Sequence, residues 1–316
     1  MMVTGPHKTT FPWRRIALSL GNALLLLLGA GVLSFVLFSI APGDPARVIL
    51  GPQASQESVD ALREKLGLNQ PLLQQGIHHL GRIASLDFGT SISNGRPVLP
   101  QVLEKFSITA TIGLQAALLS LVASYGINFL VHGFPGAVPA LGLLRLGVLM
   151  PVFLLTVLGA LLVGILFPGV SLSSAGARSG PFTQILPSLL ASLYPIAVMT
   201  TVLRDGVSTE MGRPGYRAAR SLGMGGWLVF HRGLFRPSLV PWLAVWVNQI
   251  SLVFFASLVL EVILSIPGTG NLLLTAVQTR DYPVLQGLIL VNAAFFIIIS
   301  LLADWAYPAL DPRIRS

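Results

Sequence analysis

Residues 16–43, IALSLGNALLLLLGAGVLSFVLFSIAPG, contain no Asp, Glu, Lys or Arg. A helix needs about 20 consecutive apolar residues to cross the hydrocarbon core of a bilayer. Arg14 and Arg15 precede the stretch, as basic residues precede a signal peptide. A signal core is shorter, about 7–15 residues, and ends at a small-residue cleavage site, whereas PGDP follows here. We interpret the stretch as a retained membrane helix.

The rest of the chain repeats this pattern. Only 10% of the 316 residues are charged and 53% are hydrophobic, whereas roughly 25% are charged in an average soluble domain. Prolines interrupt the third and fourth apolar stretches, which membrane helices tolerate where neighbouring groups satisfy the freed backbone. The sequence predicts an all-α polytopic membrane protein with about six transmembrane helices. The expected spans are Ile16–Ile40, Thr111–Val131, Leu143–Leu166, Leu186–Leu203, Trp242–Leu260 and Leu285–Leu302.

The charges indicate which side of the membrane each segment faces. If six spans start from an inner N-terminus, the inner segments hold twelve of the 20 cations and four of the 12 carboxylates. The net charge of +8 then falls on one side, as the positive-inside rule requires. Both termini are therefore expected in the cytoplasm. The expected divisions are tail 1–15, first helix 16–41, outer segment 42–108, a five-helix transmembrane domain 109–310 and tail 311–316.

The outer segment contains a predicted amphipathic helix at residues 55–67, SQESVDALREKLG. Ser55 supplies an N-cap oxygen and Gly67 ends the helix. Val59, Leu62 and Leu66 recur at helical spacing and form one apolar stripe. Two interpretations stay open: a helix packed over the mouth of the bundle, and a docking element for an external partner.

The cytoplasmic loop 204–237 is the most informative inner segment. Residues 217–223, RAARSLG, favour a short helix closed by a glycine, and the apolar run 227–230 follows. A helix, a glycine turn and a second helix would make a compact projection. Ala218 and Ala219 would let another protein surface approach it closely.

This run resembles the EAA motif of bacterial ABC importer permeases, with Arg217 in place of the motif's glutamate. Seven further stretches resemble the same branch in order and spacing. We therefore identify the chain as similar to the B-type inner-membrane permease subunit of dipeptide, oligopeptide, nickel and metallophore ABC importers. The stretches are residues 42–45 (PGDP), 66–72 (LGLNQPL), 87–89 (DFG), 96–98 (RPV), 261–270 (EVILSIPGTG), 280–287 (RDYPVLQG) and 310–315 (LDPRIR).

The resemblance implies a type I importer permease fold in the bacterial inner membrane. It implies a second homologous permease subunit, two ATPase subunits and an extracytoplasmic substrate-binding protein as partners. It also implies that the cytoplasmic loop docks on an ATPase, through Arg217, Ala218, Ala219, Arg220, Gly223 and Arg236. A short outer connection between spans three and four is similar to the nickel-type members. Metal chelates and small peptides both stay open as cargo.

The chain lacks the residues for chemistry of its own. A phosphate-binding P-loop places Gly before Lys, and none of Lys8, Lys65 and Lys105 follows a glycine. Cysteine is absent, and the adjacent His78 and His79 project to different sides of either a helix or a strand. We expect no enzymatic activity, cofactor or metal site in this chain, with ATP and Mg²⁺ bound by partner subunits.

Polar residues inside the apolar stretches are the candidates for a transport pathway. Such groups need hydrogen-bond partners in a bilayer, from other helices or from water. A carboxylate there is costly and often functional, so Glu261 is the first candidate, with packing against other helices as the alternative. The others are Asn248, Gln249, Ser251 and Asn292.

Three other functions compete with an importer subunit. A secondary transporter would show an inverted repeat and buried ionisable groups at mid-membrane, and the sequence shows neither clearly. A membrane scaffold would have no water-accessible route. An exporter would not need the long outer segment. Nucleic acid binding is disfavoured because the basic residues are spread over several loops without interleaved aromatic side chains.

Overall fold

The structure is a computed structural model that describes residues 13–310 except 41–44, 52, 66, 68, 135, 137, 138, 140 and 167–180. The expected tail 311–316 and most of tail 1–15 lie outside the described residues. No cis peptide occurs among the described residues, and their regular structure is helical. The helices are α1 (Trp13–Ile40), α2 (Pro45–Leu50), α3 (Gln56–Lys65), α4 (Leu72–Ala84), α5 (Val98–Gly133), α6 (Leu141–Val148), α7 (Val152–Leu166), α8 (Pro181–Met211), α9 (Pro214–Ser221), α10 (Gly226–Leu228), α11 (Arg236–Ile263), α12 (Thr269–Gln278) and α13 (Tyr282–Leu310).

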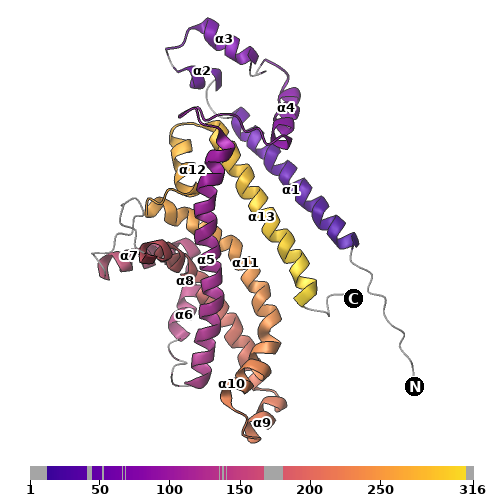
Figure 1. Ribbon diagram of the computed structural model, residues 1–316, viewed down its shortest axis with the longest axis vertical. Coiled ribbons are helices and arrows are strands. Elements are labelled where there is room, and N and C mark those ends of the chain that lie inside the picture. Colours follow the sequence, from indigo (N-terminus) through magenta and orange to yellow (C-terminus); the bar gives the residue numbers. More distant parts are fainter. Residues whose placement is uncertain are drawn as a thin grey trace, which may run out of the picture.

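Three long helices, α5, α8 and α11, form the centre of the bundle (Figure 1). Small side chains let them approach closely: a Cβ at Gly206 of α8 would lie 2.7 Å from the Ser238 hydroxyl of α11. Close approach of this kind holds membrane helices together, because lipid gives them no hydrophobic drive to associate. α13 packs along the bundle, and α1 packs on α13 at the periphery.

Five of the six expected spans are confirmed as long apolar helices. The third, Leu143–Leu166, is wrong as a continuous helix. α6 ends at Val148, and α7 begins at Val152 after Pro151. Proline has no N–H to donate and its ring clashes with the preceding turn. With 15 residues at 1.5 Å each, α7 is about 22 Å long, shorter than the roughly 30 Å hydrocarbon core.

In the fourth expected span, by contrast, prolines do not interrupt the helix. α8 runs unbroken through Pro187 and Pro195 and continues to Met211. The expected loop 204–237 is therefore shorter than its predicted bounds, because α8 covers its first residues. Similarly, α5 begins at Val98, inside the expected outer segment 42–108.

The amphipathic helix of the outer segment is confirmed as α3. The Ser58 N–H donates to the Ser55 hydroxyl oxygen (3.3 Å), and Gly67 follows the helix with a φ of +68°. Val59 is buried; the side chain of Leu62 and the whole of Leu66 lie outside the described part. α3 packs on α2, and Figure 1 places both at the end of the molecule opposite α9 and α10.

One carboxylate joins the outer segment to the bundle. Asp281, at the start of α13, accepts hydrogen bonds from the Ser91 hydroxyl (2.5 Å) and from the N–H groups of Ile92 and Ser93 (3.2 and 3.1 Å). Burial alone would raise the pKa of Asp281. The hydrogen bonds from the serine hydroxyls and backbone N–H groups outweigh burial and hold its pKa below the ordinary value.

Replacing Asp281 with Asn should therefore destabilise the protein at neutral pH. Buried donors left with a poorer acceptor cost about 1–3 kcal/mol. Because folding lowers the Asp281 pKa, the stabilisation is present above the unfolded pKa, about 3.9. It is lost as the pH falls through the lower folded value. Thermal unfolding of the purified protein should show a lower Tm for Asp281→Asn at pH 7, with the difference shrinking below about pH 4. Exposed Asp60→Asn on α3 is the control, and an equal Tm for both variants would contradict this role.

Candidate functional site

The cytoplasmic end of the bundle carries a projection, which we call the knob, residues 212–228. It consists of α9, a glycine turn and α10. α9 begins after Arg213, whose ψ of 148° is extended, and Pro214 occupies its first position, where a missing N–H costs nothing. The Gly223 N–H donates to the Arg220 carbonyl (3.1 Å), and the Met224 N–H donates to the Ala219 carbonyl (3.2 Å).

Gly223 is required by backbone geometry. Its φ is +72°, a conformation that favours glycine because it has no Cβ. A left-handed residue at this place ends the helix and turns the chain back. The predicted helix, glycine turn and second helix are therefore present.

A π-helix, Val229–Phe235, connects the knob to α11. Phe230 is fully buried, and its ring lies 5.4 Å from that of Phe129 on α5. The ring of Phe235 lies 4.8 Å from that of Tyr125 on the same helix. π-helical turns are rare and occur frequently at functional sites. The π-helix that joins the knob to α11 is thus held against α5 by aromatic packing.

The predicted coupling residues lie together on the surface of the knob, apart from Arg236. Arg217, Ala218, Arg220 and Gly223 are exposed and Ala219 is partly exposed. Arg236 is exposed at the start of α11, beyond the π-helix.

The sequence analysis identified the apolar run 227–230 but did not predict that large apolar side chains would be exposed on the knob. Leu222 is 81% exposed and Trp227 is 60% exposed, with Met224 beside them in the chain. Apolar residues next to a glycine turn in a charged loop were the available signal. The knob therefore presents cations together with large apolar side chains.

Glu261 lies at the other end of the bundle, in a cradle built from its own motif. It is fully buried, and its carboxylate accepts a hydrogen bond from the Gly270 N–H (2.7 Å) in the first turn of α12. A Cβ at Gly268 would overlap the carboxylate. The glycines of the 261–270 motif thus make room for the glutamate. This geometry favours the packing interpretation that the sequence left open.

The remaining pathway candidates do not form one cluster. Successive helical residues turn by about 100°, so Gln249 is buried while Asn248 is exposed and Ser251 is partly exposed. The Asn292 side chain donates to the Leu288 carbonyl of its own helix (2.7 Å). The structure therefore brings Asn248 and Ser251 to the accessible surface of α11 and turns Gln249 inward.

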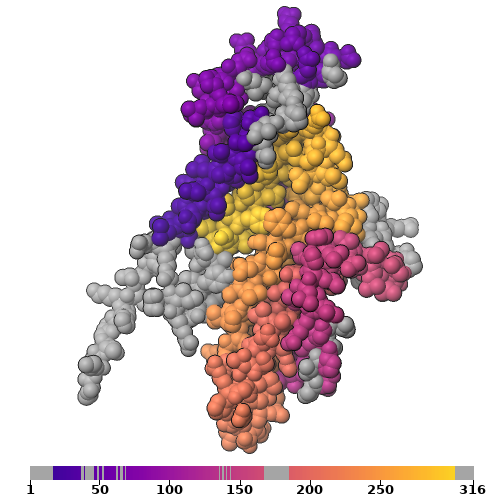
Figure 2. Space-filling view, turned by 180° about the vertical axis from the view of Figure 1, so that it is seen from behind, coloured from indigo at the N-terminus to yellow at the C-terminus, as the bar shows by residue number. Residues whose placement is uncertain are grey.

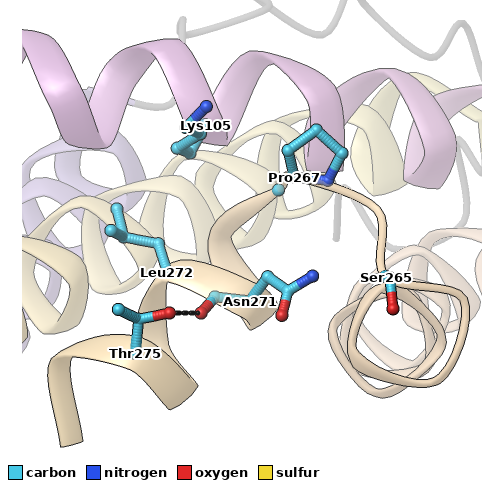
Figure 3. A pocket seen from close by; sticks show the side chains of 7 residues that line it. Lys105, Ser265, Pro267, Asn271, Leu272 and Thr275 are labelled. Carbon is cyan, nitrogen blue, oxygen red and sulfur yellow. Dashed lines mark hydrogen bonds between the residues drawn. The ribbon is translucent and has the colours of Figure 1, made fainter. Parts of the chain in front are cut away.

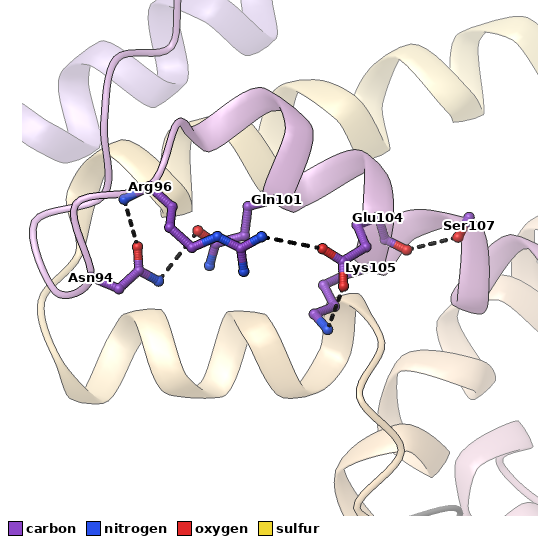
Figure 4. A network of polar contacts seen from close by, with 6 residues as sticks. All are labelled: Asn94, Arg96, Gln101, Glu104, Lys105 and Ser107. Carbon is purple, nitrogen blue, oxygen red and sulfur yellow. Dashed lines mark hydrogen bonds and ion pairs between the residues drawn. The ribbon is translucent and has the colours of Figure 1, made fainter.

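A small cleft lies beside Glu261 at the outer end (Figure 3). Its volume is about 220 Å³, and it lies between α5, the turn after α11, and α12. Lys105 lines it from α5, and its ammonium lies 3.1 Å from the Glu104 carboxylate. Figure 4 shows how Glu104 also pairs with Arg96 (3.7 Å). The full lining is Lys105, Ser265, Pro267, Gly268, Asn271, Leu272 and Thr275.

The histidines of the described segments do not gather with other ligand residues. Among the described residues, no three His, Cys, Asp or Glu side chains lie close enough together to hold a metal ion. His79 is half-buried on α4, where burial and, to a smaller extent, the Arg82 charge lower its pKa. Its ring hydrogen-bonds the Ser34 hydroxyl (3.0 Å), which is a packing contact with α1.

These features define a class of protein: a polytopic helical membrane permease with a cytoplasmic knob at one end and an outer segment at the other. The family comparison agrees. Residues 116–316 match the binding-protein-dependent transport system inner membrane component family, and residues 11–113 match the N-terminal model of such components. The chain belongs to this family of ABC importer permeases.

Curated relatives cover almost the whole chain. The glutathione transport system permease GsiC of Salmonella choleraesuis (strain SC-B67) is 33% identical over 295 residues, 92% of this chain and 94% of the relative. GsiC of Escherichia coli (strain K12) is 31% identical over 289 residues, 90% of this chain and 93% of the relative.

Membership in this family confirms the class of protein that the sequence predicted. The chain is a multi-pass permease subunit of a binding-protein-dependent ABC importer in the bacterial inner membrane. It is not an enzyme, because a separate subunit hydrolyses ATP. The secondary transporter and the scaffold are therefore excluded.

The glycine cradle gives a stability prediction. Replacing Gly270 with Ala would place a Cβ against the Leu258 carbonyl oxygen and 3.1 Å from the Glu261 carboxylate. Overpacking of this kind costs about 1–3 kcal/mol, so the Tm of the detergent-purified protein should fall. Gly126→Ala on α5 is the matched control, because nothing lies within 4 Å of its added Cβ. Equal Tm values for both variants would show that the cradle is not tight.

Proposed function

We propose that the knob is the surface through which the ATPase drives this permease. The observation that carries the proposal is the combination of exposed Leu222 and Trp227 with exposed Arg217 and Arg220 on one projection. Aromatic side chains, methionine and arginine are enriched in protein interfaces, and the knob exposes Trp227 and Met224 beside its arginines. Family membership supplies the ATPase as a partner.

The packing of the knob supports transmission of movement into the membrane. Tyr216 of α9 packs against a buried cluster that includes Leu203 of α8 and Trp242 of α11. Movement of the knob would therefore be transmitted to both α8 and α11. Coupling also requires that the knob's contacts differ between two states of the complex.

The pathway is proposed to form between this chain and a second, homologous permease subunit. Asn248 and Ser251 reach the accessible surface of α11, where an aqueous route would satisfy their hydrogen bonds. Gln249, Glu261 and Asn292 then support the helices from inside. Two ATPase subunits, holding ATP and Mg²⁺, complete the proposed assembly.

The cargo is proposed to be a short peptide or peptide-like compound. The relatives reported above are glutathione permeases by name, and they align over nine-tenths of this chain. That likeness favours peptides over the metal chelates that the sequence left equally open.

Two substitutions in the knob test the coupling. Gly223→Pro cannot adopt the positive φ, and Ala219→Glu places a bulky charge on the docking face. Both should abolish transport by the assembled importer in proteoliposomes, while the variant subunits still insert. Gly225→Ala is the control, because its φ of −58° and open surroundings accept a methyl group. Normal uptake by Gly223→Pro would overturn the assignment.

A cargo assay tests the other part of the proposal. Proteoliposomes with the complete importer and its binding protein should accumulate radiolabelled glutathione or a dipeptide when supplied with ATP. Accumulation should be unaffected when ion gradients are collapsed. Uptake of a nickel chelate in place of peptides would contradict the cargo proposal while leaving the coupling proposal intact.

A further inference from the structure

The inner ends of α5 and α8 carry polar side chains whose hydrogen-bonding capacity is not filled. Both helices run toward the knob, and the Asn128 side chain of α5 donates to the Thr200 carbonyl of α8 (3.1 Å). One helical turn further in, this register places His132 of α5 beside Arg204 of α8. Four buried side-chain atoms here have no hydrogen-bond partner in the described part of the chain: Asn128 Oδ1, Thr200 Oγ1, His132 Nδ1 and Arg204 Nη1.

Arg204 is a cation without a counter-ion among the described residues. A guanidinium has five N–H donors, yet Arg204 forms neither a hydrogen bond nor an ion pair in this part of the chain. The two carboxylates of α8 are engaged elsewhere: Asp205 pairs with Arg145 (3.7 Å), and Glu210 pairs with Arg213 (3.3 Å). Although its Nη1 atom is buried, Arg204 as a whole is partly exposed, so a small ligand can reach the side chain.

More positive charge gathers at the same place. The charges of Arg220 and Arg204 both act on the His132 ring, so the three groups lie near one another. The His132 ring also lies 5.3 Å from the ring of buried Phe230, which follows the knob in the chain. Apart from the two carboxylates of α8, residues 105–260 contain no Asp or Glu. The root of the knob is therefore a cationic cluster with a deficit of negative charge.

The cluster lies at the cytoplasmic boundary of the membrane. His132 and Arg204 are the first residues after the expected spans Thr111–Val131 and Leu186–Leu203. In Figure 2 the salmon surface of the knob forms the lower end of the molecule, beside the magenta surface of earlier helices. Water can satisfy the unpaired donors, but it leaves the arginine charges without a counter-ion, and a partly buried unpaired charge is costly. An anion would fill both deficits.

We propose that Arg204, His132 and Arg220 form a binding site for a phosphate group at the root of the knob. A guanidinium matches phosphate with two parallel N–H···O bonds, and the imidazole offers a further nitrogen donor. Basic pockets between membrane helices on the cytoplasmic side bind anionic lipid headgroups. Inorganic phosphate presents the same oxygens. The chemistry recognised is the phosphate group, which a lipid or a free ion can supply.

A phosphate bound here would join three elements of the structure. His132 belongs to α5, Arg204 to α8 and Arg220 to α9 of the knob. The anion would therefore hold the knob against the inner ends of two central helices. The inference depends neither on the cargo nor on contact between the knob and the ATPase.

Thermal unfolding of the assembled importer, purified in an uncharged maltoside detergent, tests the site. A ligand that binds the folded state raises the Tm. One probe is inorganic phosphate, with chloride at equal ionic strength as its control. The other is dioleoylphosphatidylglycerol, with dioleoylglycerol, which lacks the phosphate, as its control. Arg204→Gln removes the guanidinium, and Arg232→Gln in the π-helix is the matched variant, because it removes the same charge at an exposed position.

The proposal predicts that at least one phosphate probe raises the Tm above that of its control. The concentration that gives half of the shift should rise about tenfold in Arg204→Gln, through loss of a charge-assisted hydrogen bond. It should be unchanged in Arg232→Gln and intermediate in Arg204→Lys, which keeps the charge without the fork. A shift with phosphatidylglycerol alone assigns the phosphate to a lipid, and a shift with inorganic phosphate assigns it to a free ion.

Two results would overturn the proposal. The first is the absence of a shift with both probes, or an equal shift in the unmodified importer and in Arg204→Gln. The second is loss of the ATPase from the purified Arg204→Gln complex with no phosphate effect on the unmodified importer, because Arg204 would then contact the ATPase. If Arg204→Gln does not assemble, Arg204→Lys and His132→Gln serve for the same comparison.

Discussion

The hydrocarbon core of a bilayer offers no hydrogen-bond partner to a polypeptide backbone. Helices satisfy their own N–H and C=O groups, so an apolar segment can cross the membrane as a helix without unpaired backbone groups. This constraint explains the long unbroken helices α5, α8 and α11. It also accounts for the turn after α11, which polar groups close. After α11, the Ile266 N–H donates to the Glu261 carbonyl (2.8 Å), and the Asn271 side chain donates to the Ile266 carbonyl (2.9 Å).

Hydrogen bonds from polar side chains hold the helices together at the outer end. Thr109 of α5 hydrogen-bonds Thr269 of α12 (2.8 Å), and Glu261 binds the first turn of the same helix. Asp281 accepts hydrogen bonds that hold the loop before α5 at the start of α13. The inner end differs, because aromatic packing holds the π-helix next to the knob against α5, and the surface of the knob is exposed. Hydrogen bonds hold the outer end together, and the inner end presents the surface that we propose as the ATPase contact.

Much of this arrangement is predictable from the sequence, for physical reasons. Charge-free stretches locate the spans because charges are costly in lipid, and Gly223 marks the turn because its backbone angle favours glycine. The effect of proline was not predictable. Pro151 separates two helices, whereas Pro187 and Pro195 lie within α8, and that difference depends on packing against other helices. The contact of His79 on α4 with Ser34 on α1 was not predicted, because the two residues are distant in sequence. Asn248 and Gln249 were both predicted as pathway residues because they are adjacent in sequence, although a helix directs adjacent side chains to different sides.

We propose that the knob of this permease contacts the ATPase. Single-site cross-linking in the assembled importer tests it most directly. A benzophenone attached at Leu222→Cys should yield, on irradiation, an adduct with the ATPase subunit. The same reagent at exposed Leu273→Cys on α12, near the outer end, should yield none. No ATPase adduct from position 222, or equal adducts from both positions, would contradict the claim.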